Sequence, residues 1–151
     1  LAIPGVFFSE SDTVSPVTSL AASVANVPIA HLAGSTAPVR AMVARVRGPL
    51  TGITISNPVS GTSITWSGTV SSSQYLFIEP FRLLARLSTD PNSWWSGTSA
   101  TPGLSYDPGA ILALWPKVGT NPFERSVDFS AAVAGNGATT AIAWLAGRSW
   151  L

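Results

Sequence analysis

The sequence predicts an all-β protein, an antiparallel β-sandwich of the jelly-roll or galectin-like kind that carries an extended N-terminal arm. Three observations lead to this prediction. Apolar and polar residues alternate on both sides of a turn at Asn57-Pro-Val-Ser-Gly61, which is a hairpin pattern. Short apolar segments recur between turn residues along most of the chain. Finally, 12 prolines and 13 glycines in 151 residues leave almost no window for an amphipathic helix.

The first 22 residues are expected to form an arm or linker. They are rich in Ser, Thr and Pro and show only weak periodicity. Phe7 and Phe8 nevertheless follow Val6 directly, and a free tail does not usually expose large apolar residues together. We therefore expect the arm to dock, either on its own domain or, as the sharper hypothesis, across a subunit boundary.

Residues 23–151 are expected to form one sandwich domain, because a chain of this length fits a single core. The expected strands are, in order, Ser23–Leu32, Val39–Arg47, Ile53–Asn57, Ser63–Thr69, Tyr75–Glu79, Arg82–Leu87, Ala110–Trp115, Ser126–Val133 and Thr139–Leu145. The best helical rival, Leu83–Leu87, is short. Two longer segments, Thr89–Pro108 and Lys117–Arg125, are expected to be loops that carry contacts.

The hairpin is the best-defined of these elements. Ile53 and Ile55 point to one side of their strand, and Ile64 and Trp66 repeat the pattern after the turn. Each arm of the hairpin therefore has one buried face and one wet face.

Charge is scarce in this chain. Only 10% of the residues are charged, against about 25% in an ordinary domain, and the formal net charge is +1. A surface of this kind suits packing against other subunits, and it lacks the basic face that nucleic-acid binding needs. Arg45 and Arg47, with Arg40 nearby, form the closest approach to a basic cluster; we interpret them as a solvated strand face or as partners in intersubunit ion pairs rather than as a phosphate site.

The sequence contains few residues that could support catalysis or metal binding. The single histidine, His31, has no partner pattern for a triad or a metal site, and the absence of cysteine excludes disulfides and thiolate chemistry. The seven acidic residues show no metal-binding spacing. A glycosidase pair could still be assembled from distant strands. We expect no enzyme activity, no cofactor and no metal, and no apolar run is long enough to cross a membrane.

The tryptophans offer a second kind of site. Trp94 and Trp95 lie together in the Thr89–Pro108 segment, where exposed rings could stack on sugars. The alternative, which we favour, is that one ring plugs the sandwich and the other contacts a neighbouring subunit, because adjacent residues of an extended chain face opposite ways. Three others, Trp66, Trp115 and Trp144, are expected in the core. Trp150 is expected to cover a strand edge or to pack on another chain.

Several segments together resemble a known family. They are Val43-Ala-Arg-Val-Arg-Gly-Pro-Leu-Thr-Gly52, the hairpin Ile53–Val70, Gln74-Tyr-Leu-Phe-Ile78, and the ending Thr140-Ala-Ile-Ala-Trp144 with Arg148-Ser-Trp-Leu151. This succession looks like the C-terminal domain of the distal tail and minor tail proteins of long-tailed bacteriophages, the siphophages. His31-Leu-Ala-Gly-Ser-Thr-Ala-Pro-Val-Arg40 is similar to the turn that enters the first long strand of that domain.

The resemblance covers roughly residues 23–151 and implies a galectin-like sandwich that, in the family, follows an N-terminal ring-forming domain. Only about 22 residues precede it here, so ring formation is not expected to carry over. The resemblance implies a structural virion component at the distal end of the tail, with other tail or baseplate proteins and further copies of itself as partners. A module that binds host cell-wall glycans and a capsid decoration protein are the alternatives. Interface or glycan contacts are expected at Phe7, Phe8, Trp94, Trp95 and Trp150.

Overall fold

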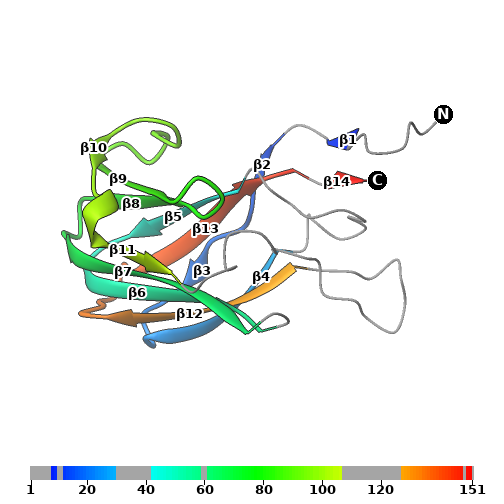
Figure 1. Ribbon diagram of the computed structural model, residues 1–151. Helices are drawn as coiled ribbons and strands as arrows, with labels where there is room; N and C mark the ends of the chain where they lie inside the picture. Colours follow the sequence, from blue (N-terminus) through cyan, green and yellow to red (C-terminus); the bar gives the residue numbers. More distant parts are fainter. Residues whose placement is uncertain are drawn as a thin grey trace.

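Two antiparallel sheets face each other across one hydrophobic core (Figure 1), and a separate pair of short strands forms a third, two-stranded sheet. This computed structural model describes residues 8–9, 12–29, 42–58, 61–106, 127–147 and 149–150. The predicted all-β sandwich is confirmed. The expected strand Ala110–Trp115, the expected loop Lys117–Arg125, and the residues Phe7, His31 and Arg40 lie outside the described residues.

The larger sheet, called here the β5 sheet, has seven strands. Six of them follow one another in the order β10 (Thr98–Ser99), β9 (Leu84–Ser88), β8 (Tyr75–Glu79), β5 (Val43–Arg47), β13 (Ala141–Ala146) and β2 (Thr13–Val14). The seventh, β3 (Thr18–Ser19), pairs with the beginning of β13. Residues 84–88 are therefore a strand, as expected, and not the rival helix, because they pair along their whole length with β8.

The smaller sheet, called here the β6 sheet, contains the predicted hairpin. Its order is β11 (Leu104–Tyr106), β7 (Thr62–Val70), β6 (Leu50–Asn57), β12 (Val127–Ala134) and β4 (Val24–Ile29). Ile53 lies opposite Trp66 and Ile55 opposite Ile64. All four side chains are buried, while Thr54 and Thr65 between them share a hydrogen bond of 3.0 Å on the other face. The expected alternation is confirmed.

Aromatic residues join the two sheets. Phe129 on β12 and Trp144 on β13 stack with ring centroids 4.9 Å apart and planes 25° apart. Trp66 is also buried, and its Nε1 donates to the carbonyl of Ala100 at 2.9 Å. The prediction that Trp66 and Trp144 belong to the core is confirmed; Trp115 lies outside the described residues.

The chain from 12 to 22 docks on the sandwich. The strands β2 and β3 both pair with β13, and between them the Ser15 amide donates to the Trp144 carbonyl at 2.7 Å, while the Ser15 hydroxyl accepts from the Trp144 amide at 2.9 Å. Leu20 is wholly buried in the main core. Further out, β1 (Phe8–Ser9) pairs with β14 (Ser149–Trp150).

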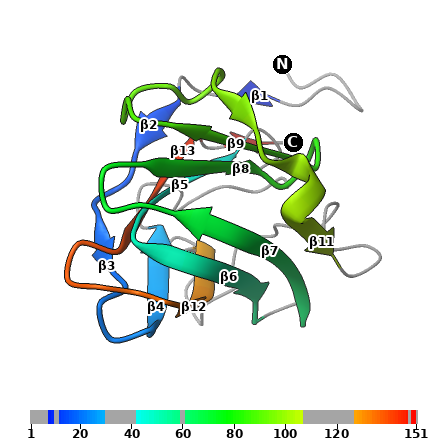
Figure 2. The same cartoon turned by 90° about the vertical axis from the view of Figure 1, so that its left-hand side faces the viewer.

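Residues 98–106 pass from one sheet to the other, a path that can be followed in Figure 2. β10 adds to the edge of the β5 sheet, a 3-10 turn at Thr101–Gly103 follows, and β11 adds to the edge of the β6 sheet. The sequence predicts only a loop here. The two strands are short and held mainly by backbone pairing with an edge, which leaves no alternating apolar pattern to read.

Candidate interaction surface

The outer face of the β5 sheet carries a group of charged and aromatic side chains. Ala44 and Val46 on β5 are buried in the core, so the alternate residues Arg45 and Arg47 point away from it. Across β8 they lie opposite Phe77 and Tyr75. The prediction that Arg45 and Arg47 share one strand face is therefore confirmed.

A second apolar cluster covers part of this outer face. It consists of Val43, Phe77 and Trp94, with Tyr75 and Leu145 packed against it. The Trp94 ring meets Phe77 edge to face, with centroids 5.6 Å apart and planes at 71°. Trp94 is thus buried, but outside the space between the sheets. The expectation that one of the paired tryptophans plugs the sandwich is wrong in its location, because the loop that carries Trp94 folds over the outer face.

Arg45, on the sheet beneath this loop, contacts the loop at two residues. Its guanidinium carbon lies 4.7 Å from the centroid of the Trp94 ring, and its Nη1 donates to the carbonyl of Pro91 at 2.8 Å. Burial lowers the pKa of Arg45 from its ordinary value, and the neighbouring Tyr75 acts in the opposite direction. The group is therefore a partly desolvated cation, which favours an anionic neighbour.

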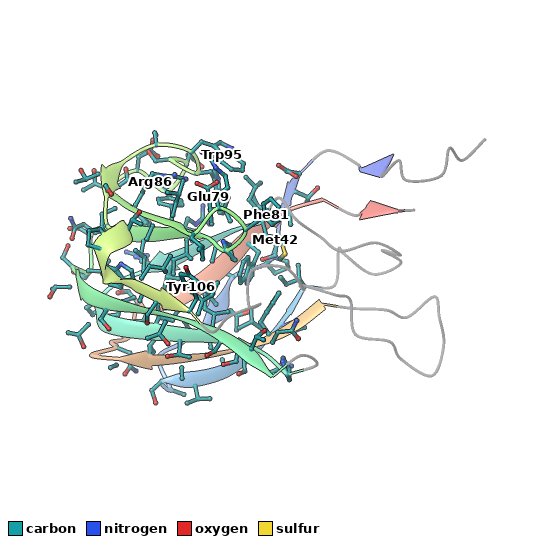
Figure 3. All side chains as sticks on the ribbon, in the orientation of Figure 1. Met42, Glu79, Phe81, Arg86, Trp95 and Tyr106 are labelled. Atoms are coloured by element: carbon teal, nitrogen blue, oxygen red, sulfur yellow. The ribbon has the colours of Figure 1, made fainter. Side chains whose placement is uncertain are left out.

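A buried ion pair holds the other end of the loop. Glu79 at the end of β8 is 3% exposed, and Arg86 on β9 donates from Nη2 to Glu79 Oε2 and, at 3.0 Å, to the carbonyl of Trp94. The exposed Arg82 approaches the other carboxylate oxygen at 3.5 Å. Figure 3 shows Glu79 and Arg86 beneath Trp95. The pair fixes the backbone at Trp94, so it acts as a positioning device for the loop.

The site residues predicted from sequence separate into three groups. Trp94 is 8% exposed and Trp95 is 54% exposed, so the two rings do face opposite ways. Phe8 and Trp150 lie opposite each other in the β1–β14 pair, of which the structure describes the backbone only. Phe7 lies outside the described residues. Contacts of Trp95 with a glycan or with another subunit stay predictions.

An open groove runs along the outer face beside the second cluster. Its walls are formed by Arg45, Arg47, Tyr75, Pro91 and Val17. Its floor is the beginning of β13, where the small side chains of Ala141 and Ala143 leave room above the sheet. The space that a water-sized molecule can occupy in the groove is about 160 Å³.

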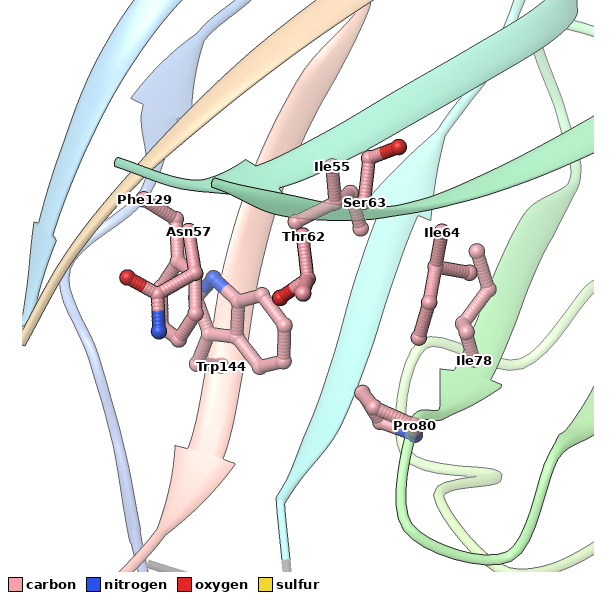
Figure 4. Close-up of a pocket in the computed structure, with 9 residues that line it drawn as sticks. All are labelled: Ile55, Asn57, Thr62, Ser63, Ile64, Ile78, Pro80, Phe129 and Trp144. Atoms are coloured by element: carbon pink, nitrogen blue, oxygen red, sulfur yellow. The ribbon is translucent and has the colours of Figure 1, made fainter. Parts of the chain in front are cut away.

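A second hollow opens between the sheets at the turn end of the hairpin (Figure 4). It is mostly apolar, with Ile55, Ile64 and Phe129 among its lining residues. The Trp144 ring nitrogen points toward the space between Asn57 and Thr62 in Figure 4. Within the described part of the chain, this buried N–H has no hydrogen-bond partner, which makes it a donor available to an oxygen atom that enters the hollow.

One side of the sandwich is almost free of charge. It is formed by β2 and β3 at one sheet and β4 at the edge of the other, and residues 13–29 contain no charged side chain. Val14, Val17 and Val24 are 43%, 64% and 64% exposed there. Exposed strand edges are usually protected by charged residues or prolines, and within β4 the one such residue is Pro28.

The described residues contain no cluster of His, Cys, Asp or Glu side chains that could hold a metal ion. Within the same ranges, no helix has the length and hydropathy needed to cross a membrane. No family model, curated protein or solved structure matches this chain. The surface must therefore be interpreted from its own geometry.

Sequence reasoning missed two features of this face. Arg45 was expected on a solvated face or in an intersubunit ion pair, whereas the structure half-buries it beneath the Trp94 loop. Glu79 was not singled out at all. Glu79 stands at the end of an apolar strand, seven residues before Arg86, and this spacing is compatible with an ion pair. Spacing alone does not show that the hairpin of β8 and β9 brings the two side chains together.

Proposed function

We propose that this chain is a structural component of a long-tailed bacteriophage virion, a minor or distal tail protein that assembles at the tail tip through surfaces of its β-sandwich. The proposal starts from the sequence resemblance. The segments that carry it become β5, β6, β7, β8 and β13, which occupy central positions in both sheets. A fold by itself does not specify a function, so the surface has to support the assignment.

The observation that carries the proposal is the uncharged side formed by β2, β3 and β4. Exposed valines on strand edges whose own residues, 13–29, carry no charge can be covered by another subunit at a low desolvation cost. Val24 lies on β4, the terminal strand of the β6 sheet, so a neighbouring tail protein or a second copy of this chain could pack directly against it. Other tail or baseplate proteins are the proposed partners.

The proposal can be tested in assembled virions. A cryo-electron microscopy map of intact particles should locate the chain at the distal end of the tail and count its copies. Location on the capsid lattice would instead favour a decoration protein and overturn the assignment.

A variant separates the role of the edge from folding. Val24→Glu should sharply reduce the number of copies per virion while the purified chain keeps its thermal stability. Thr69→Glu, at an exposed strand position on β7, is the matched control and should leave incorporation unchanged. Normal incorporation of Val24→Glu would show that this edge is not the assembly surface.

A carbohydrate-binding module is the second candidate function, and the half-exposed ring of Trp95 favours it. Trp95→Ala alone is the informative variant, because Trp94 is part of the packing. Glycan-array binding by the wild-type chain that disappears in Trp95→Ala would support this candidate, and an array without any bound glycan would count against it.

A further inference from the structure

We propose that the groove beside Arg45 and Arg47 binds an anionic sugar unit, a ring that carries a carboxylate or a phosphate group. The groove borders the assembly edge at Val17, but its arginines, Tyr75 and the alanines of β13 lie outside that edge. Binding to the groove can be tested on the isolated chain, so the inference can fail or succeed independently of the placement in a phage tail.

The charge of the groove is the first step. Arg45 and Arg47 are two residues apart on one strand face, which places their side chains about 7 Å apart at the backbone. Among the described residues, neither guanidinium forms an ion pair with a carboxylate, and Glu79 is already engaged by Arg86 and Arg82. Asp90 precedes the lining residue Pro91 in the chain, and its Oδ1 accepts from the Asn92 amide at 2.8 Å.

The second step is the fixed orientation of Arg45. The Pro91 carbonyl takes one of its five N–H donors, and the Trp94 ring lies against its plane. The other donors have no partner among the described residues. A guanidinium that is held in place and partly desolvated binds an oxyanion more strongly than a mobile surface side chain, because less side-chain freedom is lost on binding.

Shape is the third step. The space that a water-sized molecule can occupy in the groove is about 160 Å³, which is less than the roughly 300–1,000 Å³ of a pocket for a drug-sized ligand and limits the occupant to one small unit. Ala141 and Ala143 make a flat, apolar floor, and the Tyr75 ring forms part of the wall. A sugar ring has one apolar face and a rim of hydroxyl groups, which suits an alanine floor flanked by arginine donors better than an extended peptide does.

The experiment is isothermal titration calorimetry of the purified chain at low ionic strength. The probes are a glucuronate disaccharide, glucose 6-phosphate, the neutral disaccharide cellobiose, and an acidic peptide of alternating Glu and Gly. We expect at least one acidic sugar to bind, with affinity that falls as salt is raised, and cellobiose to show no binding. Binding of the carboxylate sugar alone or of the phosphate sugar alone identifies which oxyanion the groove prefers.

Variants locate the binding. Arg47→Gln should weaken it about tenfold, the usual size of one lost charge-assisted contact. Arg82→Gln removes the same charge from an exposed residue of the β8–β9 turn, away from the groove lining, and should leave the affinity unchanged. Because Arg45→Gln disturbs the loop, it serves only as a second variant whose folding is checked by circular dichroism.

Four results would overturn the inference. They are the absence of heat with both acidic sugars, equal binding of cellobiose, an equal loss of affinity in Arg82→Gln, and tighter binding of the acidic peptide. The last result would identify the groove as a contact for a partner protein's carboxylates.

Discussion

The guanidinium of Arg45 packs against one face of the Trp94 ring, 4.7 Å from its centroid, on the outer face of the β5 sheet. This contact helps to pack the loop between β9 and β10 against the outer face of the sheet. The ring covers Phe77, while the cation beneath it reaches the Pro91 carbonyl in the same loop. The loop is thus held at both its first turn and its aromatic residue, and its other tryptophan, Trp95, is left half-exposed.

Truncation of Trp94 should destabilise the domain. We expect Trp94→Ala to lower the free energy of unfolding by about 3 kcal/mol, because the variant removes a buried aromatic ring from a small cluster. Urea unfolding followed by circular dichroism measures the change. Trp95→Ala is the matched control and should stay within about 0.5 kcal/mol of wild type; equal losses would contradict the burial of Trp94.

The Glu79–Arg86 pair should be costly to break from one side. Arg86→Met leaves a buried carboxylate without its main partner, and we expect a loss of about 3 kcal/mol in the free energy of unfolding. Glu79→Gln combined with Arg86→Met removes the unpaired charge and should recover about half of that loss.

Unfolding of all four members of this double-mutant cycle provides the measurement. Additive effects of the two substitutions would mean that the contact between Glu79 and Arg86 contributes nothing of its own.

Gly97 should not accept a side chain. It has a φ of +134°, and a Cβ added there would lie 2.6 Å from the Leu87 carbonyl oxygen. Gly97→Ala should therefore loosen the Trp94 loop from β9 and lower the melting temperature. Gly61→Ala is the control, since Gly61 also has positive φ, +70°, but an added Cβ meets no atom of the described residues within 4 Å.

We expect the Gly61 variant to cost about 1 kcal/mol, the ordinary penalty for a left-handed residue, and the Gly97 variant clearly more. Differential scanning calorimetry of both proteins tests the difference. Equal melting temperatures would show that the loop moves aside without cost.

The segment before β4 should contribute to stability through Ser15. Its hydroxyl accepts from the buried Trp144 amide, so Ser15→Ala leaves that N–H without this acceptor. We expect a loss of about 1–2 kcal/mol. Ser72→Ala, in an exposed turn, is the control for the same chemical change and should be neutral. Hydrogen exchange of the Trp144 amide gives a second readout, because its protection should fall only in the Ser15 variant.

Local sequence pattern predicted those elements whose signal is carried by their own residues. The hairpin of Ile53, Ile55, Ile64 and Trp66 is readable because side chains alternate between faces along a strand, and its register follows from the turn. The same alternation placed Arg45 and Arg47 on one face. The segments β10 and β11 could not be predicted in this way, since each consists of two or three residues that pair with an edge made elsewhere in the chain.

The sequence by itself determined an all-β chain with few charges, two core tryptophans at positions 66 and 144, and opposite exposure for Trp94 and Trp95. Only the tertiary structure decided which other residues these side chains contact. It brought Glu79 to Arg86, laid Trp94 over Arg45, and joined Ser15 to Trp144 across 129 positions. The physical reason is that alternation records only which side of a strand is buried, whereas the partner on that side depends on how sheets and loops pack together.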